Sequence, residues 1–489
     1  MKIQEFPEDL RPHLIPGPSG EMVYRCLECG AEYGLEELLY TCPRCRGLFL
    51  LEEKNEARLK EHPGAFWRRL FDYRRMLNVP ALKGIFLYYE LIAPVIPLEH
   101  IIYLGEGHTP QVAANEDLQG RVGAAFYFKN DGQNPSASFK DRGMAAALSY
   151  INCLARRPGA GKVLAICAST GDTSAAAALY SSYLGGKVAS AVLLPHGKVT
   201  PQQLSQPLGA GAKVLEIPGV FDDCMKVVEA LADRYQVALL NSKNPWRLRG
   251  QESYAFEIAQ SFDYDLTKKV VVVPIGNAGN LTAILQGLLR LHDLRIIETL
   301  PRVVGVQSHH ADPVFRYYLQ PDKSKRVFTP VKVKPSVAQA AMIGNPVSMP
   351  RVIRLVEEYA RRAGEAAVAV VQVTEQEIMD SMLLANRSGH IACTQGGESL
   401  AGFRAALKAG LVGKDEVGVL DATAHHLKFV GFQQMYFDNA FPPEFEVTPK
   451  PEYVNKPQLL TPRPGDPAGK TADLVNQIAA LLDLTPKKG

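Results

Sequence analysis

The sequence has 489 residues, 46% of them hydrophobic, so it can bury large cores, and its length suggests two or three domains. Its formal net charge of +3 is too small to favour a nucleic-acid partner or an anionic membrane surface. No apolar run approaches the roughly eighteen residues that a transmembrane helix needs, and the first residues lack the apolar core of a secretion signal. We therefore expect a protein of the reducing cytoplasm, with no nucleic-acid and no membrane partner.

Two Cys-x-x-Cys pairs lie near the start of the sequence. They are Cys26 with Cys29 and Cys42 with Cys45, and twelve residues separate the pairs. Four thiolates at this spacing are typical of a tetrahedral structural zinc site. Two disulfides are a weaker alternative, because nothing indicates secretion and the other cysteines are isolated. We therefore predict a zinc ribbon over residues 20–51, followed by a helical linker over residues 52–100.

From about residue 101 to residue 432, strand-like and helix-like segments alternate. The predicted strands are residues 125–129, 162–167, 188–194, 213–217, 270–275, 302–307 and 417–420. This alternation is typical of parallel sheets flanked by helices. The sequence therefore predicts an α/β fold.

Lys140 lies in the most informative stretch, residues 134–143, which read Asn-Pro-Ser-Ala-Ser-Phe-Lys-Asp-Arg-Gly. It follows a turn of small residues and precedes an apolar helix, so we expect it at a helix N-terminus. The helix dipole and the nearby Arg142 should both disfavour its charged form, as imine chemistry requires. The same pattern also fits a surface lysine at the start of a helix. The choice between the two interpretations depends on motifs elsewhere in the sequence.

Three further segments could bind anions. Residues 169–174, Ser-Thr-Gly-Asp-Thr-Ser, and residues 276–280, Gly-Asn-Ala-Gly-Asn, each connect a strand to a helix. Such turns direct backbone N–H groups at a phosphate or carboxylate. Residues 241–252 place two arginines and a lysine near Ser242, which could grip a phosphate. Each segment alone fits a tight turn or a solvated loop equally well.

The last part of the chain is a tail over residues 441–489. It is rich in proline as far as residue 469, and residues 472–484 have an amphipathic helical pattern. We expect this helix to dock on the body of the protein or on a partner subunit.

Taken together, these motifs resemble those of threonine synthase, a pyridoxal-phosphate enzyme of the tryptophan-synthase-β fold group. The motifs follow the family's order at residues 104–110, 134–143, 169–174, 244–251, 276–280 and 423–429. Ser136 and Ala137 replace Thr-Gly before the lysine, and His426 replaces a glycine. Residues 394–399, Thr-Gln-Gly-Gly-Glu-Ser, also depart from the family's wording. These departures concern substrate preference more than the cofactor.

The resemblance implies two parallel-sheet α/β domains that follow the small zinc ribbon. The small α/β domain, residues 145–240, would be inserted into a larger one, residues 101–144 and 241–440. Pyridoxal phosphate would lie in the cleft between them. The expected assembly is a homodimer.

The resemblance also implies which residues bind the cofactor. Lys140 should form an imine with pyridoxal phosphate and then carry protons. Thr423 should hydrogen-bond the pyridine nitrogen, where a neutral hydroxyl tempers the electron sink. Asp172 should lie near the 3-oxygen. The cofactor phosphate should be held by Gly276, Asn277, Ala278, Gly279 and Asn280.

The substrate is expected to be a small phosphorylated amino acid. By resemblance, Ser169, Thr170 and Thr173 should meet its carboxylate or phosphate, and Ser242 and Arg247 should bind its phosphate. The implied reaction converts O-phospho-L-homoserine and water to L-threonine and phosphate, by γ-elimination followed by β-hydration. A cysteate-synthase-like β-replacement on O-phosphoserine is the alternative on the same fold. A non-catalytic zinc-ribbon adaptor is a remote alternative, which the intact lysine and glycine loop disfavour.

Overall fold

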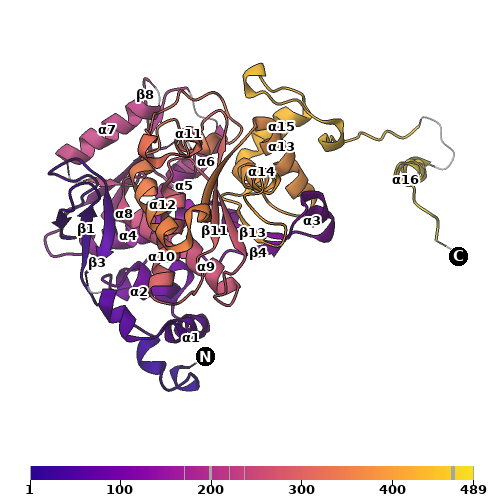
Figure 1. Ribbon diagram of the computed structural model, residues 1–489. Helices are drawn as coiled ribbons and strands as arrows, with labels where there is room; N and C mark the ends of the chain where they lie inside the picture. Colours follow the sequence, from indigo (N-terminus) through magenta and orange to yellow (C-terminus); the bar gives the residue numbers. More distant parts are fainter. Residues whose placement is uncertain are drawn as a thin grey trace.

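The computed structural model describes residues 2–54, 56–169, 171–197, 201–219, 221–235, 237–463 and 469–487. These residues form a small antiparallel ribbon, a four-stranded sheet and a six-stranded sheet, with helices around the two larger sheets (Figure 1). The α/β fold predicted from the sequence is confirmed. No helix among these residues is long and apolar enough to cross a membrane.

The six-stranded sheet has the order β12-β11-β10-β13-β5-β4, and all its strands are parallel except β4 at one edge. Its strands are β4 (Gln111–Ala113), β5 (Phe126–Lys129), β10 (Lys269–Pro274), β11 (Arg302–Ser308), β12 (Val368–Val373) and β13 (Val417–Asp421). In β10, Val271 and Val273 belong to one hydrophobic core, and Val270 and Val272 to another. The sheet is therefore covered on both faces, as parallel sheets are.

Helices form the layers on these two faces. Those around this sheet are α8 (Pro245–Gln251), α9 (Ser253–Ser261), α10 (Gly279–Asp293), α11 (Pro313–Leu319), α12 (Met349–Ala363), α13 (Glu375–Arg387), α14 (Thr394–Lys408) and α15 (Val430–Phe437). The core that contains Val271 includes residues of α10 and α12, whereas the core that contains Val270 includes residues of α13 and α14.

The four-stranded sheet is fully parallel, with the order β8-β7-β6-β9. Its strands are β6 (Val163–Ala168), β7 (Val188–Pro195), β8 (Lys213–Ile217) and β9 (Val237–Leu239). The helices beside it are α4 (Lys140–Ala155), α5 (Asp172–Tyr183), α6 (Pro201–Gly209) and α7 (Phe221–Arg234). Helix α4 contacts both α5 and α8, so it lies between the two sheet systems.

The ribbon consists of β1 (Met22–Cys26), β2 (Glu32–Tyr33) and β3 (Phe49–Glu53), which pair in the order β2-β1-β3. Three helices follow it: α1 (Gly64–Arg74), α2 (Tyr89–Ile92) and α3 (Glu116–Val122). Arg351 of α12 donates to the Phe49 carbonyl at 2.7 Å, and Arg249 of α8 donates to the Leu51 carbonyl at 3.0 Å. These bonds fasten the ribbon to the body.

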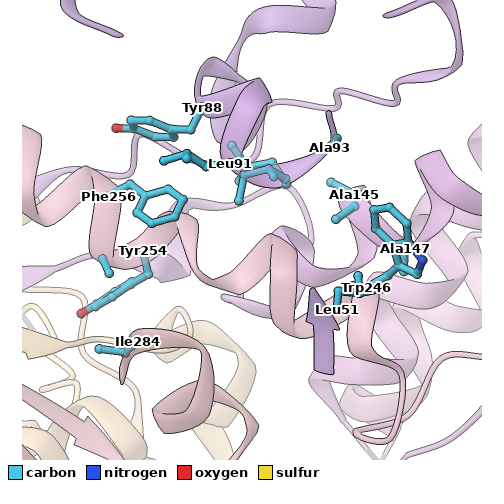
Figure 2. Close-up of a cluster of buried hydrophobic side chains, with 14 of the residues drawn as sticks. Leu51, Tyr88, Leu91, Ala93, Ala145, Ala147, Trp246, Tyr254, Phe256 and Ile284 are labelled. Carbon is cyan, nitrogen blue, oxygen red and sulfur yellow. The ribbon is translucent and has the colours of Figure 1, made fainter. Parts of the chain in front are cut away.

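A single hydrophobic core joins the ribbon to the α/β body (Figure 2). Leu51 of β3, Leu91 of α2 and Trp246 of α8 are all buried in it. The Trp246 ring stacks on Tyr150 of α4 with 4.5 Å between ring centroids. The segment predicted as a helical linker therefore contributes buried side chains to the main core.

The seven predicted strands are confirmed, each within one residue at either end. Three strands were missed: β4, β9 and β12. The first two have only three residues each, too few to show a pattern. Strand β12 was missed although Gly364 separates it from α12 and its sequence is mostly valine and alanine.

The tail begins by packing on the body and then leaves it. Phe441, Phe445 and Tyr453 pack against the core that contains Val270. The last helix, α16 (Gly469–Leu481), ends three residues before the predicted boundary and stands clear of the body in Figure 1. The predicted docking of this helix on the body is therefore wrong for this structure, and docking on a partner subunit stays a prediction.

Candidate active site

Lys140 is the first residue of α4, at the end of the tight turn that precedes the helix. Within that turn Ala137 has a φ of 64°, a left-handed conformation that favours glycine. Two backbone hydrogen bonds connect this turn to the segment that follows β13. The Phe139 N–H donates to the Thr423 carbonyl at 2.8 Å, and the His425 N–H donates to the Ala137 carbonyl at 3.0 Å. Lys140 is thereby fixed next to Thr423, which lies far away in the sequence.

The amine of Lys140 is easier to deprotonate than an ordinary lysine. Burial, and then the nearby Arg247 guanidinium, lower the pKa of Lys140 to about 7. Asp172 and Asp421 act in the opposite direction, and Lys428 lowers the pKa further. A lysine with this pKa is about half neutral at pH 7, against roughly one part in 3000 for a free lysine side chain.

Arg142, which we expected to lower this pKa, is not among the groups that mainly set it. The Arg142 guanidinium is buried and points to two carboxylates, with Nε 2.7 Å from Asp131 Oδ2 and Nη1 2.5 Å from Glu257 Oε1. Lys129 Nζ also lies 2.6 Å from Glu257 Oε2. This network anchors the start of α4, and the cation that acts on Lys140 is Arg247 instead.

The glycine loop, residues 276–280, connects β10 to α10. Ala278 adopts a left-handed φ of 60°. A Cβ on Gly276 would lie 3.0 Å from the Cα of Ala341, which is tighter than ordinary packing. Asn280 at the start of α10 donates to Asp421 Oδ2 at 2.7 Å, and Asp421 lies near enough to Lys140 to influence its pKa. The loop, the end of β13 and Lys140 therefore meet at one edge of the large sheet.

Lys428 connects two of the predicted motifs. Its Nζ lies 2.9 Å from Asp172 Oδ1 at the start of α5, and it donates to the Ser136 carbonyl at 2.9 Å. No role for Lys428 follows from the sequence alone, although it lies within the motif at residues 423–429. Its distance in sequence from both partners hid the contact.

The remaining residues of the 169–174 turn are described in part. The Ser169 hydroxyl accepts from the Gly171 N–H at 3.2 Å. Thr173 is partly exposed in the first turn of α5. Thr170 lies outside the described residues.

Arg247 is a buried guanidinium with spare hydrogen-bonding capacity. It is 3% exposed, and its Nη1 donates to the Leu240 carbonyl at 3.0 Å. Its Nε has no hydrogen-bond partner among the described residues, and no carboxylate there acts on its pKa. Burial lowers the pKa of Arg247 to about 10. A buried cation with free donors fits a bound anion.

Ser242 lies at the start of the same segment. Its carbonyl accepts from Arg351 Nη1 at 3.1 Å, which fixes its backbone.

Thr423 is buried beside a thiol that the sequence did not reveal as part of the site. Its Oγ1 lies 3.7 Å from Cys393 Sγ, at the N-terminus of α14. Two residues earlier, burial raises the pKa of Asp421 well above its usual range. Asp421 Oδ1 has no hydrogen-bond partner in the described part of the chain.

Comparison with known proteins shows the family of the chain. The sequence model of the family "Pyridoxal-phosphate dependent enzyme" matches residues 102–421. The threonine synthase of Methanocaldococcus jannaschii is 35% identical over 417 residues, which cover 83% of this chain and 93% of that protein. The threonine synthase of Methanosarcina acetivorans is 35% identical over 408 residues, which cover 83% and 91%. The chain belongs to the threonine synthase family. It is a pyridoxal-phosphate dependent lyase.

Solved structures support the same fold. Threonine synthase from Escherichia coli superimposes with a TM-score of 0.59 at 20% identity, covering 88% of this chain and 93% of that one. Threonine synthase from yeast gives a TM-score of 0.60 at 17% identity, covering 89% and 94%. The resemblance seen in the motifs is therefore confirmed by whole-chain comparison.

The four cysteines of the ribbon come together as a separate cluster. The Sγ atoms of Cys26 and Cys45 are 3.4 Å apart, and those of Cys29 and Cys42 are 3.7 Å apart. All four Sγ atoms lie within 4.8 Å of one another. The cysteines are free thiols, since a disulfide needs about 2.05 Å between sulfurs. Four converging thiols are the donor set of a tetrahedral zinc site.

Proposed function

We propose that this member of the threonine synthase family converts O-phospho-L-homoserine and water to L-threonine and phosphate, with Lys140 as the lysine that attaches pyridoxal phosphate. The observation that supports this most is the meeting of a low-pKa amine with a buried, carboxylate-free arginine, Arg247. An amine that is partly neutral near pH 7 can form a covalent bond to a carbonyl group and accept protons. A free buried guanidinium suits a leaving phosphate.

The glycine loop is proposed to hold the cofactor phosphate. Gly276, Asn277, Ala278, Gly279 and Asn280 lead into the N-terminus of α10, where backbone N–H groups and the helix dipole favour an anion. A Cβ at position 276 would come within 3.0 Å of Ala341, so a larger residue there would require Ala341 to shift. The cofactor, when bound, supplies an electron sink that stabilises negative charge on substrate carbons.

Two side chains are proposed to orient the cofactor ring. Thr423 would hydrogen-bond the pyridine nitrogen, and Asp172 would lie near the 3-oxygen. Both residues lie near Lys140, since the Thr423 carbonyl accepts from the Phe139 N–H and the charge of Asp172 raises the pKa of the Lys140 amine. The ion pair with Lys428 keeps the Asp172 carboxylate in place.

Lys140 is proposed to carry the protons of the reaction. Its Nζ would remove the proton from the substrate α carbon. It would then return protons to carbon atoms further along the substrate's side chain. The surrounding charges set a balance, because Arg247 and Lys428 favour the neutral amine and Asp172 and Asp421 favour the charged one. This balance keeps both protonation states accessible near neutral pH.

The substrate's own phosphate is proposed to bind at Arg247 and Ser242, separately from the cofactor phosphate. Ser169, Thr170 and Thr173 would meet its carboxylate. Separate sites for the two phosphates are supported by two separate sets of donors, since Arg247 lies in α8 and the glycine loop leads into α10. Charge-assisted, bidentate contacts are the stronger kind of hydrogen bond to a phosphate.

We also propose a structural zinc ion at Cys26, Cys29, Cys42 and Cys45. The free thiols lie at the spacing and proximity that such a site needs. The ribbon packs on α8 and α12 through Arg249 and Arg351, so the metal would stabilise the surface that backs the Arg247 helix.

The wider organisation is proposed as well. A small α/β domain of residues 145–240 would move against a large one of residues 101–144 and 241–440, in a cytoplasmic homodimer. Residues 441–489 would form the tail.

The test is an assay of the purified chain with O-phospho-L-homoserine, in which L-threonine and phosphate are measured. O-phosphoserine, with and without sulfite, is the matched control substrate. Formation of threonine with phosphate supports the proposal. Turnover of O-phosphoserine with sulfite alone would assign the chain to a β-replacement instead.

A further inference from the structure

A second cluster of metal-binding side chains lies away from the four cysteines and from Lys140. His309 and His310 directly follow β11, and Glu446 comes from the tail. His309 Nε2 is 3.0 Å from Glu446 Oε2, and His310 Nε2 is 3.4 Å from Glu446 Oε1. One ligand atom from each residue lies within 4.8 Å of the other two. Two ligands bound tetrahedrally at about 2.0–2.1 Å stand about 3.3 Å apart, so these spacings suit a shared ion.

The His310 ring directs its Nε2 toward Glu446, and this nitrogen has no hydrogen-bond partner among the described residues. It is 2% exposed, and its Nδ1 lies 2.5 Å from the Pro335 carbonyl. A carbonyl only accepts, so Nδ1 carries a proton, and Nε2 presents a lone pair when it carries none. That lone pair faces a carboxylate oxygen and has no hydrogen-bond partner among the described residues. A cation held between this nitrogen and the carboxylate would bind to both.

The surroundings of His310 are those of a preorganised ligand. Glu375 Oε1 lies 3.6 Å from His310 Nδ1, on the side opposite Glu446. Glu375 is fully buried, and its Oε2 accepts from the Val337 N–H at 2.7 Å and from the Ser336 hydroxyl at 3.1 Å. A carboxylate and a carbonyl behind a histidine fix its tautomer and raise its basicity toward a metal.

The site is open on the side of the tail. The Glu446 side chain is half exposed, so water can complete the coordination. Lys334 Nζ also lies 3.4 Å from Glu446 Oε1, but its side chain is 62% exposed and can swing away. Two imidazoles and one carboxylate favour zinc and similar late divalent ions over magnesium or calcium, which prefer oxygen ligands.

We propose that His309, His310 and Glu446 bind one zinc-type divalent cation, which clasps the tail to the carboxyl end of β11. The clasp is independent of the proposed reaction. The neighbouring tail already lies on the body, where Phe445 and Val447 pack against the core and Lys450 Nζ is 2.5 Å from Asp380 Oδ2. The ion would cross-link the tail to the body next to these contacts.

The test uses the full-length holoenzyme, titrated with cobalt and then with zinc in phosphate-free buffer. Glu446→Gln removes the charged ligand but preserves shape. The wild type should bind one metal equivalent more than Glu446→Gln, and that equivalent should lack the strong thiolate absorption of a cysteine site. His309→Gln should lose the same equivalent or bind it at least tenfold more weakly.

The control is Lys334→Gln, which removes the competing cation. It should bind the extra equivalent at least as tightly as the wild type. Zinc should also slow amide exchange in residues 441–454 of the wild type but not of Glu446→Gln. If the wild type and Glu446→Gln bind equal numbers of ions, a proton on His310 supplies the charge and the proposal is overturned. The number of bound metal ions does not depend on whether either variant forms threonine. Failure of the metal-site proposal can therefore be distinguished from failure of the proposed reaction.

Discussion

Removing the Arg247 guanidinium should weaken substrate use and change the acidity of Lys140 together. Arg247→Met keeps most of the buried volume while it deletes the charge and the free donors. Hydrogen bonds to a charged group contribute about 1.5–3 kcal/mol net, so losing the grip on the substrate phosphate corresponds to roughly ten- to 150-fold. We expect kcat/KM for O-phospho-L-homoserine to fall by that factor, measured by phosphate release.

The same substitution has a second readout, in the apo protein. Arg247 lowers the pKa of Lys140, so its removal raises that pKa above about 7. Only the neutral amine attacks the cofactor's aldehyde. The rate at which pyridoxal phosphate attaches should therefore rise with pH through a midpoint near 7 in the wild type, and through a higher midpoint in Arg247→Met. Absorbance of the protein-bound cofactor follows this rate.

A matched control lies two residues along the same helix. Arg249 is also buried, but it donates to the Leu51 carbonyl and lies 3.4 Å from Glu252, so its role is to hold the ribbon. Arg249→Met should lower Tm and leave both the attachment midpoint and kcat/KM near wild type, measured below its Tm. If Arg247→Met loses pyridoxal phosphate but shows normal kinetics once the cofactor is restored, Arg247 serves the cofactor and the division between two phosphate sites is wrong.

Three further variants test other parts of the site. Lys140→Ala should lose both the absorbance of the bound cofactor and threonine formation, because it removes the attachment point and the proton carrier together; near-normal values of either would contradict the assignment. Lys428→Met removes a cation that lowers the pKa of Lys140 and the partner of Asp172, so the attachment midpoint should move to higher pH, and an unchanged midpoint would refute the electrostatic account. Cys42→Ser should abolish zinc binding at the ribbon and lower Tm while the cofactor absorbance remains, and equal zinc content in mutant and wild type would count against the four-cysteine site.

Much of the fold was predictable because its signals are local. Strands β10 and β11 are continuous apolar runs that a buried parallel sheet requires, and they are bounded by turn residues. Strands β4 and β9 carry no comparable signal, because three residues cannot display a period. The exposed position of α16 was not predictable either, since an amphipathic pattern shows which face is apolar but not what covers it.

The site was predictable in its parts but not in its electrostatics. The motif around Lys140 correctly predicted its position at a helix N-terminus, yet Arg142 was chosen as the cation that acts on it because it is adjacent in sequence. In the structure Arg142 is committed to Asp131 and Glu257, and the acting cation, Arg247, comes from another helix. Cys393 was missed for the same reason, because only the tertiary fold brings it to Thr423.

The most direct test of the central claim is to incubate the wild-type holoenzyme with O-phospho-L-homoserine and to quantify both products. We expect equal amounts of L-threonine and inorganic phosphate, and no threonine from the Lys140→Ala variant under the same conditions. Phosphate release without threonine, or turnover of O-phosphoserine with sulfite and none of O-phospho-L-homoserine, would contradict it.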